Sequence, residues 1–192
     1  MRLIFATHND HKVHEVQDKL GRYFEVDSLS DIGYHDEIPE TSETLRGNAV
    51  QKARTVYDRF QSPCFSDDTG LVIDALGGKP GVYSARYAGA GKNADANIDK
   101  VLLELEGVVD RKARFITYIA LMIKQEVYVF EGRVEGKITY ERRGDSGFGY
   151  DPIFIPDGHT KSFAQMTLEE KNQISHRALA MEKFIYFLHK LL

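Results

Sequence analysis

The sequence places two acidic residues side by side, and this pair is the first candidate for chemistry. Asp67 and Asp68 lie in CFSDDTGL (64–71), directly before Thr69 and Gly70. Adjacent strand residues point to opposite faces, so both carboxylates can face one ion only if a strand ends here, as Thr69-Gly70 indicates. Carboxylates suit Mg²⁺, which binds one or two of them together with substrate phosphates, and a neighbouring carboxylate can take a proton from water. A solvated Asp-rich turn explains the pair equally well.

A second stretch, THNDHK (7–12), stands where a strand is expected to give way to a helix. Helix N-termini present unpaired N–H groups and a partial positive charge, and therefore hold phosphate well. Thr7 and Asn9 can donate hydrogen bonds, and Lys12 adds a full charge. Taken alone, this stretch is better explained as a plain cap, with Asn9 as N-cap and Lys12 solvated.

A third stretch, SGFGYDP (146–152), has the residue types that hold a nucleobase. Its glycines permit close backbone approach, its aromatic side chains offer faces for stacking, and its aspartate can accept from ring N–H groups. A β-turn with two buried aromatic residues is the simpler explanation. The residues concerned are Gly147, Phe148, Gly149, Tyr150 and Asp151.

Cations gather near the C-terminal end in KNQISHR (171–177), which is expected to open the last helix. Lys171, His176 and Arg177 can hold a polyphosphate or read a carbonyl oxygen on a base. They can equally pair with the glutamates just before them. Arg86, in KPGVYSARYAG (79–89), can reach phosphate or form an ordinary salt bridge.

The elements that position these residues alternate between strand and helix. Apolar runs and their spacing predict strands over 2–7 and 24–29, a helix over 11–21 ending at Gly21, and a hairpin of strands 113–123 and 127–136 turning at Lys124-Gln125. Asn93 or Asp95 is expected to cap a helix, and Thr167 with Glu170 forms a capping box before the C-terminal helix. This order predicts an α/β fold, with a mixed sheet and helices packed on it.

A longer amphipathic helix is expected over 44–60, with Thr41 or Ser42 as its cap. Glu40 and Glu43 stand just before it, so its start can bring further carboxylates to the acidic pair.

Length and composition favour an ordinary globular protein. The chain has 192 residues, of which 42% are hydrophobic and 28% charged, and a formal net charge of -4. One domain over 1–192 accommodates this length. The net charge gives no indication of a nucleic-acid surface, and no apolar run is long enough for a membrane span. Cys64, the only cysteine, excludes an internal disulfide and fits a reducing cytoplasm.

Considered together, these stretches are more specific than each is alone. In order they are T-x-N-x-x-K, ETSETLRGNAVQKA, SDDTGL, PGVYSARYAG, SGFGYDPIF, SFAQM and EKNQISHRA, running from residue 7 to about 180. The set closely resembles the inosine triphosphate pyrophosphatase family. The resemblance implies hydrolysis of ITP, dITP and XTP to the monophosphate and pyrophosphate with Mg²⁺, which removes deaminated purines from the nucleotide pool.

The same resemblance implies an elongated mixed sheet flanked by helices, two lobes with a central cleft, and a cytoplasmic homodimer. Purine nucleoside triphosphates are the expected partners, with no nucleic-acid polymer and no membrane. Asp68 matches the general base, and Asp67, Asp68 and Glu40 match metal-site positions. The implied substrate contacts are Thr7, His8, Asn9, Lys12, Lys52, Thr69, Arg86, Phe148, Gly149, Tyr150, Asp151, Lys171, His176 and Arg177.

Two positions depart from the family pattern. ETSET stands where many members have ETG, and Gly47 stands where the helix usually carries a glutamate, so an auxiliary acidic ligand is absent there. Two alternatives remain open: a Maf-like pyrophosphatase of other specificity, and a nucleotide-binding module without turnover.

Overall fold

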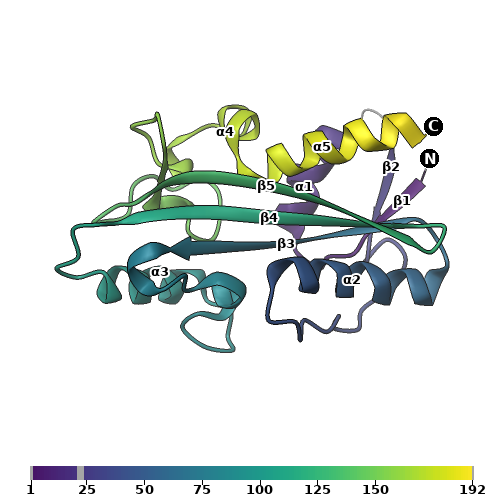
Figure 1. Cartoon of the computed structure of the whole chain (residues 1–192), viewed down its shortest axis with the longest axis horizontal. Coiled ribbons are helices and arrows are strands. Elements are labelled where there is room, and N and C mark those ends of the chain that lie inside the picture. Colours follow the sequence, from purple (N-terminus) through teal and green to yellow (C-terminus); the bar gives the residue numbers. More distant parts are fainter. Residues whose placement is uncertain (1, 21–23, 192) are drawn as a thin grey trace. The chain divides into compact units, whose positions relative to one another are not determined.

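The computed structural model describes residues 2–20 and 24–191, in which a mixed β-sheet is accompanied by helices (Figure 1). The six strands are β1 (Arg2–Phe5), β2 (Glu25–Ser28), β3 (Cys64–Ile73), β4 (Lys112–Ile123), β5 (Glu126–Ile138) and β6 (Phe154–Pro156). Their order is β2-β1-β3-β4-β5-β6. β1 pairs in parallel with β2 and β3, whereas β5 and β6 are antiparallel. The expected α/β fold with a mixed sheet is confirmed.

The helices follow the predicted order, except that two helices stand where one C-terminal helix was expected. The α-helices are α1 (Asp10–Leu20), α2 (Leu45–Phe60), α3 (Ala94–Glu104), α4 (Leu168–Ile174) and α5 (His176–Leu191). Short 3₁₀ helices lie at η1 (Asp74–Leu76), η2 (Gly81–Arg86), η3 (Asp151–Ile153) and η4 (Phe163–Gln165). Within the described residues, no helix is both long and apolar enough to span a membrane.

The chain folds into two compact units. Unit 1 contains Met1–Asp68, Thr117–Gly132 and Leu179–Leu192, and unit 2 contains Thr69–Ile116 and Arg133–Ala178. Strands β3, β4 and β5 contribute residues to both. Each unit has its own hydrophobic core, and each contains some of the candidate residues.

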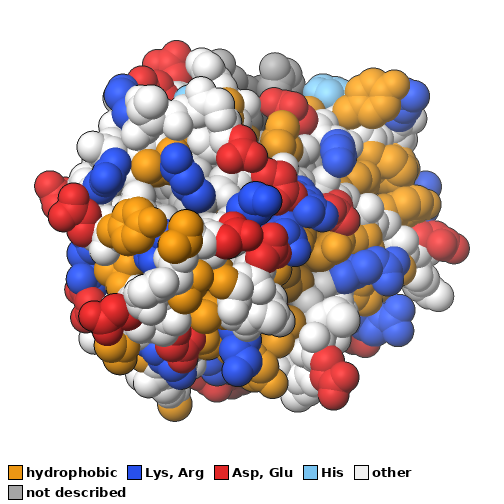
Figure 2. All heavy atoms as spheres, turned by 60° about the vertical axis from the view of Figure 1, so that its left-hand side comes forward, with side chains coloured by type: hydrophobic (Ala, Val, Ile, Leu, Met, Phe, Trp, Pro, Cys, Tyr) orange, Lys and Arg blue, Asp and Glu red, His pale blue; other side chains and the backbone are white. Residues whose placement is uncertain are grey.

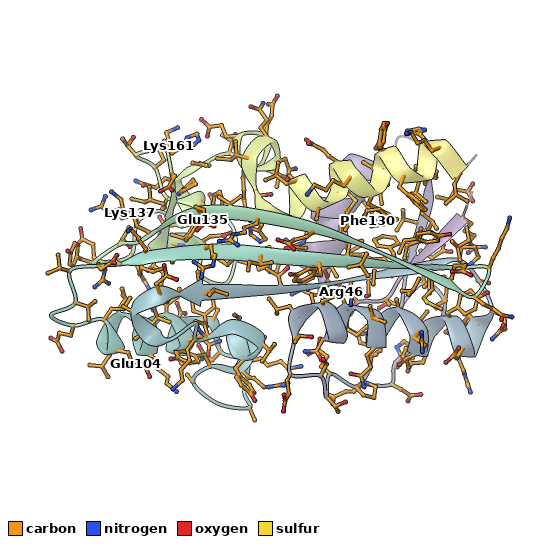
Figure 3. The ribbon with its side chains drawn as sticks, in the orientation of Figure 1. Arg46, Glu104, Phe130, Glu135, Lys137 and Lys161 are labelled. Atoms are coloured by element: carbon orange, nitrogen blue, oxygen red, sulfur yellow. The ribbon has the colours of Figure 1, made fainter. Side chains whose placement is uncertain are left out.

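Unit 1 has a helix layer on each face of its part of the sheet, because its strand residues alternate in direction. On one face, α1 and α5 pack against the odd-numbered positions Leu3, Phe5 and Phe65. On the other face, α2 packs against the even-numbered positions Ile4, Ala6 and Cys64. Phe130 of β5 extends toward α5 (Figure 3), where its ring centroid lies 5.3 Å from that of Phe187.

Unit 2 encloses a separate core between α3 and the parts of β3 to β6 that belong to it. Ile98, Val101 and Leu105 form the buried side of α3, and they pack with Leu71 and Ile73 of β3. Phe115, Phe154 and Phe163 form an aromatic group in the same core, with the Phe115 and Phe154 ring centroids 4.8 Å apart. This buried aromatic group supports the side chains of unit 2 that are described below.

Several local predictions are confirmed and one is wrong. Lys124 and Gln125 join β4 to β5 with positive φ at both positions, as a two-residue hairpin turn requires. Asn93 caps α3, as one of the two predicted residues. The cap of α2 is Thr44, not Thr41 or Ser42: its hydroxyl accepts from Gly47 N at 3.0 Å. The predicted stop at Gly21 lies outside the described residues.

On the face drawn in Figure 2, basic side chains are interspersed with acidic ones. The predicted lack of a nucleic-acid partner is not tested by this distribution and stays a prediction.

Candidate functional site

Asp67 and Asp68 lie in the middle of a strand, which corrects the expectation that a strand ends at this pair. β3 continues through them to Ile73, because the apolar residues after Gly70 extend the same strand into the core of unit 2. The two side chains consequently point to opposite faces of the sheet. Asp67 lies on the face covered by α1, and Asp68 lies on the face covered by α2.

Each aspartate is paired with a lysine of the helix on its own face. Lys12 Nζ of α1 lies 2.8 Å from Asp67 Oδ1, and Lys52 Nζ of α2 lies 3.0 Å from Asp68 Oδ1. Both aspartates are buried, and so is Lys52. Lys12 is therefore not a solvated lysine, as the simpler explanation of its stretch required, and the acidic pair is not a wet turn.

Lys52 bridges two carboxylates. Its Nζ lies 2.6 Å from Glu40 Oε1 as well as 3.0 Å from Asp68 Oδ1. Burial alone would lower the pKa of Lys52, but the charges of the neighbouring carboxylates outweigh burial and raise it. Burial raises the pKa of the Asp68 carboxyl, against the opposing effects of Lys52 and Lys12. Asp68 is thus a carboxylate of raised basicity, as a general base requires.

The segment that carries Glu40 is tied to α2. Asn48, which is buried, accepts from Ser42 N through its side-chain oxygen at 2.9 Å. Thr41 N donates to Gln51 Oε1, also at 2.9 Å. These two bonds hold residues 41–42 against the helix, and they explain how Glu40 reaches Lys52. Lys52 is thus paired with Glu40, whereas Glu43, the other acidic candidate, is exposed.

The residue types fit a divalent cation that arrives with phosphate. Among residues 2–20 and 24–191, no three His, Cys, Asp or Glu side chains form a group that could hold a metal. Mg²⁺ keeps several waters and binds through one or two carboxylates plus phosphate oxygens, and Glu40 with Asp68 provide such a pair. The metal roles of Glu40, Asp67 and Asp68 stay predictions.

The stretch 7–12 forms a capped helix start. Asn9 Oδ1 accepts from Lys12 N at 3.3 Å, and Thr7 Oγ1 accepts from Asn9 N at 3.2 Å. His8 lies beside another loop: its Nε2 is 3.0 Å from the Asp36 carbonyl oxygen, and its ring stacks on Tyr34. The first turn of α1 therefore lies directly beside the Lys12–Asp67 pair.

In unit 2, Asp151 fixes the glycine-rich turn. Asp151 Oδ2 accepts from Phe148 N at 2.9 Å and from Lys171 Nζ at 2.8 Å. A Cβ at Gly147, which has φ +77°, would overlap this carboxylate, so glycine is required there. Tyr150 is buried, and its hydroxyl donates to the Ser84 carbonyl at 2.8 Å. Tyr150 thus matches the simpler explanation of a core aromatic residue, and its role as a base contact is untested.

The cations of 171–177 lie on two helices, which corrects the expectation of a single last helix. Ser175 is extended (φ −69°, ψ 152°), and its hydroxyl accepts from Ala178 N, so it ends α4 and caps α5. Lys171 lies in the last turn of α4, whereas His176 and Arg177 begin α5. Lys171 pairs with Asp151, and the Glu170 that was its alternative partner binds Lys161.

Two cations lie close to the ring of Phe148. Lys171 Nζ is 4.8 Å and Arg177 Cζ 5.5 Å from its ring centroid. Arg177 also lies 3.3 Å from Thr69 Oγ1. Unit 2 therefore brings together Thr69, Phe148, Asp151, Lys171 and Arg177, as expected of a site for an aromatic, oxygen-rich ligand.

Two more residues of the predicted set, His176 and Arg86, make other contacts than those described above. His176 is buried and stacks on Phe115, with ring centroids 4.5 Å apart and planes 15° apart. Arg86 lies at the end of η2, where its guanidinium stands 5.7 Å from the Tyr83 ring.

Sequence reasoning did not identify Phe115, Asn48 or Ser175. Phe115 is one apolar residue within a long strand, and its sequence gives no sign that its ring stacks on His176. Asn48 is a polar residue on the apolar side of α2. This position indicates a buried hydrogen bond, and the sequence analysis could have used it. Serine is a common N-cap residue, but the apolar residues before and after Ser175 keep helical spacing, so the sequence predicted one uninterrupted helix.

The chain is similar to known proteins over nearly its full length. The sequence model described as the Ham1 family matches residues 3–187. A dITP/XTP pyrophosphatase of Porphyromonas gingivalis is 54% identical over 188 residues, 97% of each chain. A dITP/XTP pyrophosphatase of Bacillus subtilis is 50% identical, covering 94% of this chain and 93% of that protein. The structure of the Staphylococcus aureus Ham1 protein superposes with a TM-score of 0.91 at 35% identity, covering 100% of both chains.

Proposed function

Because the chain belongs to the Ham1 family, we propose that it hydrolyses deaminated purine nucleoside triphosphates to the monophosphate and pyrophosphate. The substrates are dITP, XTP and ITP, the first two of which appear in the names of its relatives. The observation that carries the proposal is Asp68: a buried carboxylate of raised pKa beside a buried lysine, in a chain so similar to those enzymes. Family membership also favours this function over the Maf-like alternative.

The proposed reaction is an attack by water on the α-phosphorus. Asp68 takes a proton from the water, the new Pα–O bond forms, and the bond from Pα to the bridging oxygen of pyrophosphate breaks. Lys12 and Lys52 offset the negative charge of the triphosphate, and the N-terminus of α1 adds N–H donors. Glu40 and Asp68, which reach the same point, would hold Mg²⁺ together with the phosphates, and the cation would supply further positive charge to the leaving group.

Base selection is a matter of hydrogen-bond donors. Hypoxanthine and xanthine carry an acceptor oxygen at position 6, where adenine carries an amino donor. A donor on Arg177 or His176 that faces this position rejects adenine, because two donors would then oppose each other out of water. The ring of Phe148, with a cation on it from α4 and another from α5, offers the stacking surface.

We further propose a cytoplasmic homodimer that cleanses the nucleotide pool; the buried, free thiol of Cys64 accords with a reducing compartment.

The test compares five nucleotides under one condition. The protein is incubated with Mg²⁺ and ITP, dITP, XTP, GTP or ATP, and pyrophosphate and orthophosphate are measured separately. We expect pyrophosphate from the first three and little from GTP and ATP. Orthophosphate as the product, or equal rates on all five, would refute the proposal. Tight binding without any product would establish the nucleotide-binding module instead.

A further inference from the structure

Lys52 holds together the two carboxylates that can share one cation. The sequence suggested Asp67 and Asp68 as that pair, but they point to opposite faces of the sheet. Glu40 and Asp68 instead reach the same point from different segments, and each lies within hydrogen-bonding distance of Lys52 Nζ. The point that a cation common to both carboxylates would occupy is therefore taken by an ammonium group.

The ammonium is well matched to this position. It carries donors for both carboxylates. The side chains of Lys52 and Asp68 are 9% and 12% exposed, so water provides little alternative compensation for the charge of Asp68, whereas Glu40 is 33% exposed. A divalent cation at the same carboxylates would be repelled by an ammonium that stayed in place. The two cations consequently exclude each other unless Lys52 moves to another anion.

A triphosphate supplies that other anion. The lysine side chain is a point charge on a flexible four-carbon stem, so it can leave a carboxylate for a phosphate oxygen without a change in α2. Phosphate oxygens also complete the coordination of a cation such as Mg²⁺, which binds few protein ligands.

We propose that Lys52 takes the place of the divalent cation in the nucleotide-free protein, so that the cation binds only together with a triphosphate. On binding, the ammonium moves from the carboxylates to phosphate, and the cation takes over Glu40 and Asp68. This inference rests on the proposed function for the nucleotide, but it assigns to Lys52 a role in the order of binding rather than in turnover.

The test is a Mn²⁺ titration of the whole protein by calorimetry and electron paramagnetic resonance, without any measurement of turnover. We expect no Mn²⁺ site in the nucleotide-free protein and one site when a non-hydrolysable α,β-methylene analogue of ITP is present. Lys52→Met and Lys52→Gln should both bind Mn²⁺ without nucleotide, about tenfold or more tightly than the unchanged protein, because the buried carboxylate of Asp68 and the partly buried one of Glu40 are then uncompensated. Glu40→Gln added to Lys52→Gln should abolish this gain.

The matched control is Lys161→Met, which removes the lysine of an exposed pair with Glu170 (Figure 3 labels Lys161). It should leave Mn²⁺ binding as in the unchanged protein. Nucleotide-free Mn²⁺ binding as tight in the unchanged protein as in the Lys52 variants would overturn the proposal, and so would variants that fold, by circular dichroism, yet gain no site. The nucleotide-free titrations decide the role of Lys52 even if none of the nucleotides is hydrolysed.

Discussion

Asp67 and Asp68 are neighbours in the chain, but they lie on opposite faces of the sheet and bind lysines of different helices. Asp67 pairs with Lys12 of α1, and Asp68 pairs with Lys52 of α2. Two adjacent like charges are thus separated by the pleat of a strand, and each is compensated locally. Because their surroundings differ, substitutions at the two positions should have different effects.

Replacement of Asp68 tests its role as the general base. Asp68→Asn should lower kcat with ITP by about 100-fold or more, as expected when a general base is lost, while ITP binding measured by calorimetry persists. Asp67→Asn should mainly raise KM for ITP, because Asp67 holds Lys12 at the start of α1. Near-normal turnover in Asp68→Asn would remove this residue from the role of base.

The raised pKa of Asp68 predicts a pH dependence. The base acts only when deprotonated, so kcat/KM should fall as the pH drops through the Asp68 pKa, which burial raises above the ordinary 3.8. The charge of Lys52 opposes this rise, so the position of the acid limb reports the balance of burial against that charge. An acid limb at or below the ordinary value, measured as kcat/KM against pH, would contradict this account.

The local elements were predictable because their determinants are close in sequence. The turn at Lys124-Gln125 and the capping box of Thr167 with Glu170 each involve only a few consecutive residues, and the structure shows both. The break at Ser175 was not predicted, because helical spacing continues across it and only the backbone shows that the serine caps a new helix.

The partners within the site were less predictable than its members. The resemblance supplied Glu40, Lys52 and Asp68, but no sequence pattern indicates that one ammonium lies between the two carboxylates. That arrangement depends on the packing of α2 against β3 and on the bonds that hold residues 41–42. The sheet faces to which Asp67 and Asp68 point likewise depend on whether the strand continues past them. Thr69-Gly70 indicated that it ends, but β3 continues to Ile73.

The two departures from the family pattern are joined in space. A Cβ at Gly47 would overlap Ser42 Oγ and lie 2.7 Å from Ser42 Cβ, so rotation of the serine hydroxyl cannot relieve the contact. Gly47→Ala should therefore destabilise the protein by about 1–3 kcal/mol, although alanine normally favours a helix. Ser42→Gly combined with Gly47→Ala should recover part of this loss, because the added Cβ would still lie 2.9 Å from Thr44 Oγ1. Urea unfolding measures both, and additive effects would show that the two residues are independent.

The buried pair of Asp151 and Lys171 should matter for stability. Asp151→Asn leaves a buried ammonium without its countercharge, which costs about 3–5 kcal/mol in the free energy of unfolding. The exposed pair of Lys161 and Glu170 is the control, and Glu170→Gln should leave the unfolding midpoint nearly unchanged. Equal urea midpoints for the two variants would show that burial does not determine the effect.

Replacement of Arg177 tests how the base is read. Its guanidinium lies beside Phe148 and Thr69, so it can donate to a base that stacks on Phe148. Arg177→Ala should reduce the ratio of kcat/KM for ITP to that for ATP by about tenfold, as expected for one buried donor. Arg86→Ala, at a predicted phosphate contact, should lower kcat/KM for both nucleotides equally, because they share the triphosphate. An unchanged ratio in Arg177→Ala, together with a reduced ratio in His176→Ala, would show that His176, and not Arg177, recognises the 6-oxygen.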